Sequence, residues 1–100
     1  DTDAEIRDLL QNTKRIAVIG IKMESYQPAF YVPQYMKSAG FEIIPVPVYY
    51  PEATEILGEK VYRKLTDIPG DIDLVNIFRR SGDVAKHTED ILEKKPKAVW

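Results

Sequence analysis

A glycine and three cations in this sequence form a pattern suited to holding a phosphate. Gly20 ends one apolar run and Lys22 lies just beyond it, while Arg79, Arg80 and Ser81 end another. A glycine turn lets backbone amides approach an anion closely, and nearby cations add charge to the same place. The alternative is that Gly20 is only a tight turn and that the arginines are solvated. Two arginines and a serine at a neighbouring strand end favour the phosphate site.

The elements around these residues indicate an α/β fold. Residues 15–48 follow the order strand, glycine turn, helix, strand, which opens a doubly wound sheet. The order along the chain predicts a single domain over residues 1–100, with a three-layer, Rossmann-like parallel sheet of strand order 3-2-1-4-5. The ligand crevice of this topology lies between strands one and four. The predicted strands cover residues 15–19, 42–48, 61–62 and 72–78, with a fifth that opens at Ala98, after which the sheet is truncated.

Prolines and caps set the bounds of three predicted helices. A capping box begins a helix over residues 3–12. In the second helix Pro33 is tolerated only in the first turn, so we expect a start near Phe30 and an end at Gly40. The residues of this helix that should face the sheet are Val32, Tyr35, Met36 and Ala39. A third helix, begun by Ser81 or Asp83 and ended by Pro96, should place on one face Val84, Thr88, Ile91 and Leu92.

Composition excludes several classes of function. The 14 Lys and Arg are balanced by 16 Asp and Glu, so no basic field attracts nucleic acid. The absence of cysteine removes disulfides and thiolate chemistry, and His87 as the single histidine removes a multi-histidine metal site. The apolar runs are too short to span a membrane, and the acidic start does not resemble a signal peptide. We expect a cytoplasmic protein; the start without methionine and the end within a strand indicate part of a longer domain.

Catalytic groups are not indicated by the sequence. His87 is interpreted as a surface or helix-flank residue, and Ser25 and Ser81 have no base near them in the sequence. The acidic loop of residues 52–59 is interpreted as solvated rather than metal-binding. We therefore expect no catalytic residue and no metal. Five tyrosines are interpreted as packing residues or as a contact between identical subunits, which would make the protein a homo-oligomer. They are Tyr26, Tyr31, Tyr35, Tyr49 and Tyr50.

The apolar end of the second strand narrows the class of ligand. Pro45 and Pro47 donate no ladder hydrogen bond, so this half of the strand should be splayed or at an edge of pairing. A nicotinamide dinucleotide site needs Gly-x-Gly-x-x-Gly and an acid at this strand end for the ribose hydroxyls. After Gly20 no glycine occurs before Gly40, and the first carboxylate after the strand is Glu52. A proline-lined tip can receive adenine but not a free ribose diol, which disfavours NAD and favours a nucleotide with a phosphorylated ribose.

Several segments, in register along most of the chain, resemble one known family. They are KRIAVIG at residues 14–20, Pro28, Val32 with Tyr35 and Met36, GFEIIPV at 40–46, EILGEKVY at 55–62, LTDIP at 65–69 and VNIFRRS at 75–81. Together they resemble the stand-alone CoA-binding domain family, which is similar to the N-terminal domain of the succinyl-CoA synthetase alpha subunit. No single segment is very specific, but all of them in order are.

The resemblance implies a Rossmann-type domain that binds coenzyme A. It places the pyrophosphate at the loop and helix start formed by Gly20, Ile21, Lys22, Met23, Glu24, Ser25 and Pro28. It places the adenosine near Val46 and Pro47, and it faces the pantetheine or the phosphates with Phe78, Arg79, Arg80 and Ser81. Family members commonly carry serine, arginine and serine where this chain has Lys22, Gln27 and Ala29, which changes the expected phosphate contacts.

The expected function is binding of coenzyme A or acyl-CoA without catalytic activity of the chain itself. Two alternatives remain open at the level of the sequence. One is the CoA-binding domain of an ADP-forming acyl-CoA synthetase whose catalytic parts lie elsewhere. The other is a regulatory domain that binds NAD(P) or another adenine nucleotide.

Overall fold

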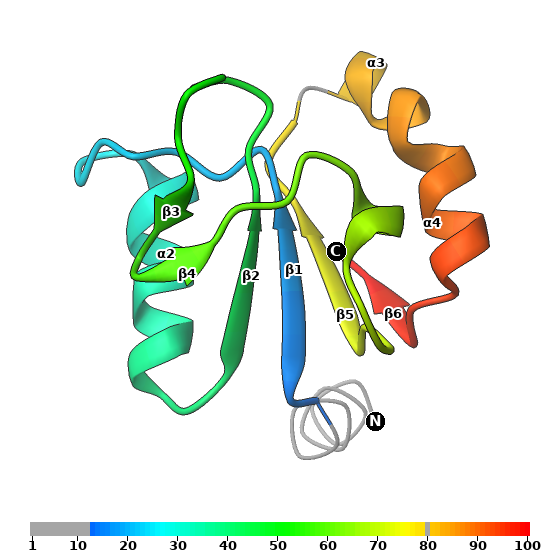
Figure 1. Cartoon of the computed structure of the whole chain (residues 1–100), viewed down its shortest axis with the longest axis horizontal. Coiled ribbons are helices and arrows are strands. Elements are labelled where there is room, and N and C mark those ends of the chain that lie inside the picture. Colours follow the sequence, from blue (N-terminus) through cyan, green and yellow to red (C-terminus); the bar gives the residue numbers. More distant parts are fainter. Residues whose placement is uncertain (1–12, 80) are drawn as a thin grey trace.

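A four-stranded parallel sheet forms the centre of the molecule (Figure 1). The structure is a computed structural model that describes residues 13–79 and 81–100, so the helix expected over residues 3–12 lies outside the described residues. The strand order is β2-β1-β5-β6. The strands of this sheet are β1 (Arg15–Ile19), β2 (Glu42–Val46), β5 (Leu74–Ile77) and β6 (Ala98–Val99). The predicted parallel α/β sheet is confirmed, with the expected strands two, one, four and five as neighbours.

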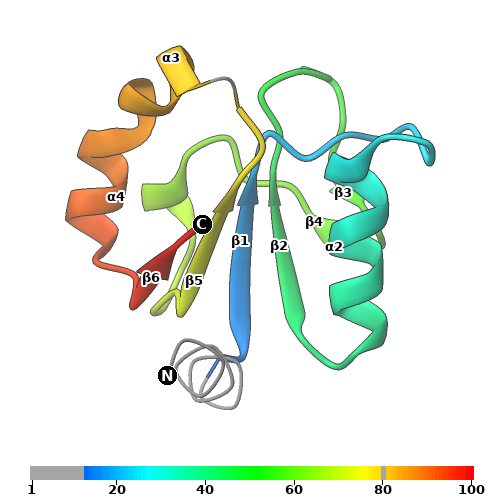
Figure 2. The same ribbon diagram turned by 180° about the vertical axis from the view of Figure 1, so that it is seen from behind.

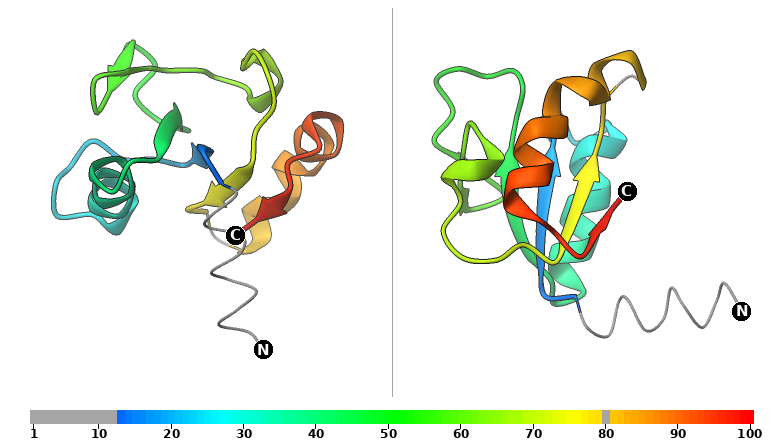
Figure 3. Two further views of the ribbon diagram at one scale, coloured as in Figure 1. Left: turned by 90° about the horizontal axis from the view of Figure 1, so that it is seen from below. Right: turned by 90° about the vertical axis from the view of Figure 1, so that its right-hand side faces the viewer.

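Both faces of the sheet are covered, which explains why β1 is apolar at consecutive positions. Ile16 and Val18 belong to a core cluster against which Met36 of helix α2 (Pro28–Ser38) packs. Ala17 and Ile19 belong to a cluster on the other face, with Ile91 of helix α4 (Thr88–Lys94). Figures 2 and 3 show α2 on one side of the sheet and α4 with the 3-10 turn η1 (Leu65–Asp67) on the other. The three predicted layers are therefore present.

The expected third strand at residues 61–62 is wrong. A two-stranded antiparallel hairpin, β3 (Glu55–Ile56) with β4 (Glu59–Lys60), lies at this edge instead, and the chain then passes β2 with one backbone bond, from Tyr62 N to Pro45 O. The reason is register. The Glu42 amide donates to β1, so alternate positions along β2 face outward, and Pro45 and Pro47 provide no N–H there. The outer edge of β2 thus lacks the donors that a further strand needs.

Helix α2 begins at Pro28, two residues earlier than expected, and contains Pro33 beyond its first turn. The buried residues of this helix are Ala29 and Pro33, whereas Tyr35 is 74% exposed. The expected sheet-facing set was therefore wrong in Tyr35 and in Ala39, which is an exposed cap outside the helix. The helix start obeys the preference for proline at the first position, where an amide has no partner anyway.

The expected third helix is divided into α3 (Ser81–Val84), the 3-10 turn η2 (Ala85–His87) and α4. Because a 3-10 turn changes the helical phase, Thr88 and Leu92 are exposed while Ile91 packs against the core. The single apolar face expected for this segment was thus wrong. Its end was predicted correctly, since α4 stops at Lys94 and Lys95 adopts a left-handed conformation before Pro96.

A partly buried carboxylate, that of Asp73, fixes the amino end of β1. The Asp73 Oδ2 atom accepts hydrogen bonds from the amides of Lys14 and Arg15, both at 3.0 Å, and Asp73 Oδ1 pairs with Lys97 at 3.3 Å. The Arg15 amide is the largest cause of a lowered Asp73 pKa. These contacts hold the starts of β1 and β5 together at the end of the sheet opposite the candidate site. In the part of the chain that the structure describes, no helix is long and apolar enough to span a membrane.

Candidate functional site

The candidate site lies where β1, β2 and β5 end, at the upper edge of the sheet in Figure 1. Backbone bonds tie the three strand ends together: Gly20 N donates to Val46 O at 2.9 Å, and Phe78 N donates to Ile19 O at 2.8 Å. Gly20 has φ +82°, and a Cβ atom there would lie less than 3.0 Å from the carbonyl oxygen of Phe78. Glycine is therefore required by both the backbone conformation and the close approach of β5.

The loop of residues 20–27 folds back onto the first turn of α2. Pro33 has no N–H, so the carbonyl of Ala29, four residues earlier, receives no helical hydrogen bond from it. The Lys22 amide donates to this carbonyl at 3.1 Å. A proline inside the helix thus supplies the acceptor that holds the loop, and the Lys22 amide is directed to the helix rather than to the crevice.

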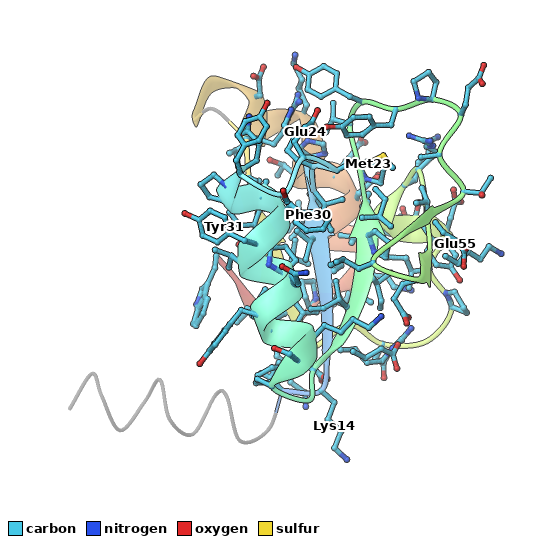
Figure 4. All side chains as sticks on the ribbon, turned by 90° about the vertical axis from the view of Figure 1, so that its left-hand side faces the viewer. Lys14, Met23, Glu24, Phe30, Tyr31 and Glu55 are labelled. Atoms are coloured by element: carbon cyan, nitrogen blue, oxygen red, sulfur yellow. The ribbon has the colours of Figure 1, made fainter. Side chains whose placement is uncertain are left out.

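A carboxylate of the chain itself occupies part of the loop. Glu24 accepts hydrogen bonds from the Tyr50 hydroxyl and from the Met23 amide, the latter at 3.2 Å. The Tyr50 hydroxyl is the main cause of a lowered Glu24 pKa, and burial, followed by the Glu24 contact, raises the pKa of Tyr50. Figure 4 shows Met23 and Glu24 together above the strand ends, far from Lys14 at the opposite end of the sheet. We call this contact the Glu24–Tyr50 clasp.

A pocket of about 360 Å³ lies between the loop after β1 and the end of β5. Two cations line it, and we call it the cationic pocket. The Lys22 Nζ atom stands 4.0 Å above the centre of the Tyr49 ring, and the Arg79 Nε atom is buried with no hydrogen-bond partner among the residues the structure describes. The carboxylate of Asp83 also borders the pocket and pairs with Lys86 at 3.0 Å. The cationic pocket is lined by Lys22, Tyr49, Phe78, Arg79 and Asp83.

A second pocket, of about 220 Å³, lies over the ends of β1 and β2 and has largely apolar walls. We call it the apolar pocket; it is lined by Ile19, Val46, Pro47, Val48, Arg63 and His87. The Arg63 guanidinium donates to the carbonyls of Tyr49, Tyr50 and Ala53, which fixes the loop after β2. The interpretation of His87 as a surface or helix-flank residue fits its half-buried side chain, although one ring nitrogen, Nε2, is buried and, among the described residues, has no partner.

The structure brings together around the two pockets six of the thirteen residues singled out as site residues in the sequence. Gly20, Lys22, Phe78 and Arg79 meet around the cationic pocket, and Val46 and Pro47 line the apolar pocket. Ile21 is instead a core residue, 1% exposed, so it anchors the loop from below. At the surface lie Met23, Ser25 and Pro28, the last as the first residue of α2; Ser81 is the first residue of α3, and Arg80 lies outside the described residues.

Sequence reasoning missed seven residues of the two pockets and the clasp as site residues. Ile19 and Val48 belong to the predicted first and second strands, and their place at the strand ends was a usable signal. Tyr49 and Tyr50 directly follow the second strand, and this adjacency to a strand end was a usable signal. His87 lies six residues after Ser81, the last residue of the predicted phosphate-facing segment, so its signal in the sequence was weaker. Arg63 and Asp83 carried none, since their positions depend on how distant segments pack. In the part of the chain that the structure describes, no group of three or more His, Cys, Asp or Glu residues is arranged to hold a metal.

Known proteins resemble this chain both in amino-acid sequence and in fold. A family model described as CoA binding domain matches residues 14–100. The uncharacterized protein YneT of Bacillus subtilis (strain 168) is 41% identical over 97 residues, which are 97% of this chain and 70% of that protein. A hypothetical protein from Pyrococcus horikoshii OT3 and the cell-free ID.343 protein from Thermus thermophilus each have a TM-score of 0.89 at 32% identity. Each alignment covers 98% of this chain, and 67% and 72% of those chains respectively.

Proposed function

The chain belongs to the family of CoA binding domains, and from this membership we propose that it binds coenzyme A or an acyl-CoA across the ends of β1, β2 and β5. The observation that carries the proposal is the cationic pocket, where Lys22 and Arg79 converge beside the Gly20 turn. The buried, unpartnered Nε of Arg79 supports this assignment, because a buried donor without an acceptor is costly and a phosphate oxygen would accept from it.

The proposed pyrophosphate contacts come more from side chains than from loop amides. The amides of Gly20 and Lys22 already donate to Val46 and Ala29, and the Met23 amide donates to Glu24. Lys22 and Arg79 therefore supply the charge that the amide cradle of a glycine-rich loop supplies elsewhere. We assign the pyrophosphate to the cationic pocket and the adenine ring to the apolar pocket beside Val46 and Pro47.

The proposal distinguishes coenzyme A from NAD. A free ribose diol is normally held by an acid at the end of the second strand. In this chain that end is formed by Val46, Pro47 and Val48, which offer no carboxylate. A ribose that carries a 3′-phosphate has no need of that acid, and the nearby cations favour the added charge. No catalytic step is part of the proposal.

A thermal-shift measurement on the full chain tests the proposed function. At a hundredfold excess over its dissociation constant, coenzyme A should add about 2.7 kcal/mol of stability, and NAD at the same concentration should add none. For a domain of this size each kcal/mol corresponds to about 4–8 °C. No shift with coenzyme A at millimolar concentration would refute the proposal.

Charge-reversal variants locate the phosphates. Arg79→Glu and Arg80→Glu should each remove most of the shift with coenzyme A. The matched control is Lys64→Glu, which reverses one charge on an exposed residue that lines neither pocket. The melting temperature without ligand shows that each variant is folded. Equal shifts in Arg79→Glu and in the control would place the phosphates elsewhere.

A further inference from the structure

His87, which lines the apolar pocket, carries a ring nitrogen for which the described residues provide no hydrogen-bond partner. His87 Nε2 is buried and has no hydrogen-bond partner among the residues the structure describes, although the ring borders a pocket rather than the tightly packed core. Buried polar atoms in folded proteins nearly always have a partner, and an exception calls for an explanation. A ligand that enters the pocket and meets this nitrogen explains why the nitrogen is left free.

The imidazole is held in its neutral form. Burial is the largest cause of a lowered His87 pKa, followed by the charge of Arg79, and the opposing carboxylates of Asp90 and Asp83 contribute less. At neutral pH the ring therefore has one donor and one acceptor nitrogen, which suits a neutral partner. A phosphate would favour a charged ring, so the chemistry of this nitrogen differs from that of Lys22 and Arg79 in the cationic pocket.

Arg63 closes the opposite part of the pocket without offering its charge freely. Three of its hydrogen bonds go to the carbonyls of Tyr49, Tyr50 and Ala53. Because these bonds engage three of the five N–H donors of the guanidinium, they fix the plane of the group and leave its face to contact a ligand. Guanidinium faces stack on flat heteroaromatic rings.

The pocket therefore suits a planar ring with apolar faces and a hydrogen-bonding edge. Its walls are the side chains of Ile19, Val46, Pro47 and Val48. The pantetheine arm of coenzyme A is a flexible chain that offers no aromatic face to the guanidinium plane of Arg63. An adenine ring buries its faces against the walls and presents its edge to one partner.

We propose that His87 determines base specificity by hydrogen bonding through Nε2 to the edge of an adenine ring seated in the apolar pocket. This inference rests on the proposed function, and it adds a residue from the segment after β5 to the contacts made by the tip of β2. It also assigns Arg63 the role of a stacking wall. The ligand class at this pocket is an adenine nucleotide.

The single histidine of the chain makes the test direct, because His87 gives the only Cε1–H resonance of the imidazole region in an NMR spectrum. The full chain is titrated with coenzyme A, with adenosine 3′,5′-bisphosphate and with pantetheine. The His87 resonance should move with the first two and remain with pantetheine. A resonance that stays in place while coenzyme A raises the melting temperature, or that moves with pantetheine only, overturns the inference.

Failure of the proposed function has a different signature. If coenzyme A produces no thermal shift, a movement of the resonance with adenosine 3′,5′-bisphosphate still supports adenine recognition by His87. Without that movement both proposals are refuted.

Two variants separate the hydrogen bond from the packing of the ring. His87→Phe keeps a flat apolar ring and should weaken adenosine 3′,5′-bisphosphate about three- to tenfold, the loss of one hydrogen bond. His87→Gln places an amide near the Nε2 position and should restore part of that loss. The melting temperature of ligand-free His87→Phe should equal or exceed that of the wild type, because the variant removes an unpaired buried nitrogen. Unchanged affinity in His87→Phe contradicts the inference.

Discussion

Replacement of Gly20 by alanine probes the contact on which the candidate site is built. The φ of +82° costs an alanine about 1–2 kcal/mol. The added Cβ would also meet the carbonyl oxygen of Phe78 at less than 3.0 Å. That carbonyl belongs to the backbone of the β5 end, which is bonded to Ile19, so it moves only if the strand end moves. Overpacking of this kind adds about 1–3 kcal/mol, and we expect a total loss of about 2–5 kcal/mol.

Gly58→Ala is the matched control for this experiment. Gly58 has φ +75°, and its nearest neighbour would be the flexible Lys37 Nζ atom at 3.5 Å. The variant therefore carries the conformational cost of about 1–2 kcal/mol without a clash. The entropy that alanine removes from the unfolded chain is common to both variants and cancels in the comparison. The excess loss in Gly20→Ala measures the close approach of β1 and β5.

Urea denaturation of both variants gives the free energies of unfolding. We expect Gly20→Ala to be less stable than Gly58→Ala by at least about 1 kcal/mol, or about 4 °C or more in melting temperature. Because the same Cβ would lie 3.4 Å from Arg79 Cδ, coenzyme A affinity should also fall in Gly20→Ala and not in the control. Equal stability of the two variants would refute the account of the strand ends given above.

Two further expectations concern carboxylates. Glu24→Ala should strengthen coenzyme A binding in calorimetry, because it removes a negative charge beside Lys22 and one of the two acceptors of the Met23 amide, the other being the Tyr50 hydroxyl. The control is Glu55→Ala on the distant hairpin, and weaker binding of Glu24→Ala would mean that the clasp instead orders the loop. Asp73→Asn should cost about 1–2 kcal/mol at neutral pH, because charge-assisted hydrogen bonds are replaced by neutral ones. Since the folded pKa of Asp73 is lowered, the stability that its carboxylate contributes is complete above the ordinary pKa of 3.8 and is lost as pH falls through the folded pKa. The urea denaturation curves of the wild type and of Asp73→Asn should therefore converge in acid. Curves that remain apart would mean that another group is responsible.

The central sheet could be predicted because its strands are covered on both faces. Such strands are continuous apolar runs, and glycine and proline mark their ends, so β1, β2, β5 and the opening of β6 were recognisable. The same argument places residues at strand ends next to one another. The sequence alone was therefore enough to predict that residues at these strand ends meet, namely Gly20, Lys22, Phe78 and Arg79.

The prediction of an outer third strand was wrong for a reason that was present in the sequence. Pro45 and Pro47 are two residues apart, so their missing N–H groups lie on one edge of β2. Combined with the pairing of β2 to β1, this spacing predicts a bare outer edge rather than a third strand. The division between α3, η2 and α4 had no comparable signal, because a 3-10 turn is decided by packing.

The apolar pocket could not be assembled from the sequence. Its walls come from β1, from the tip of β2, from Arg63 after the hairpin and from His87 before α4. Local patterns specify each element but not the distance between their side chains. A buried nitrogen without a partner becomes visible only when the surrounding atoms are in place.

The proline within α2 links two parts of the molecule that are usually independent. Because Pro33 has no N–H to offer the carbonyl of Ala29, four residues earlier, the Lys22 amide donates to this carbonyl instead. Moving the loop away from the sheet would leave that carbonyl without its hydrogen-bond partner, so opening the pocket on this side costs free energy in the helix itself. The loop of residues 20–27 should therefore keep its place against the first turn of α2 when a ligand binds.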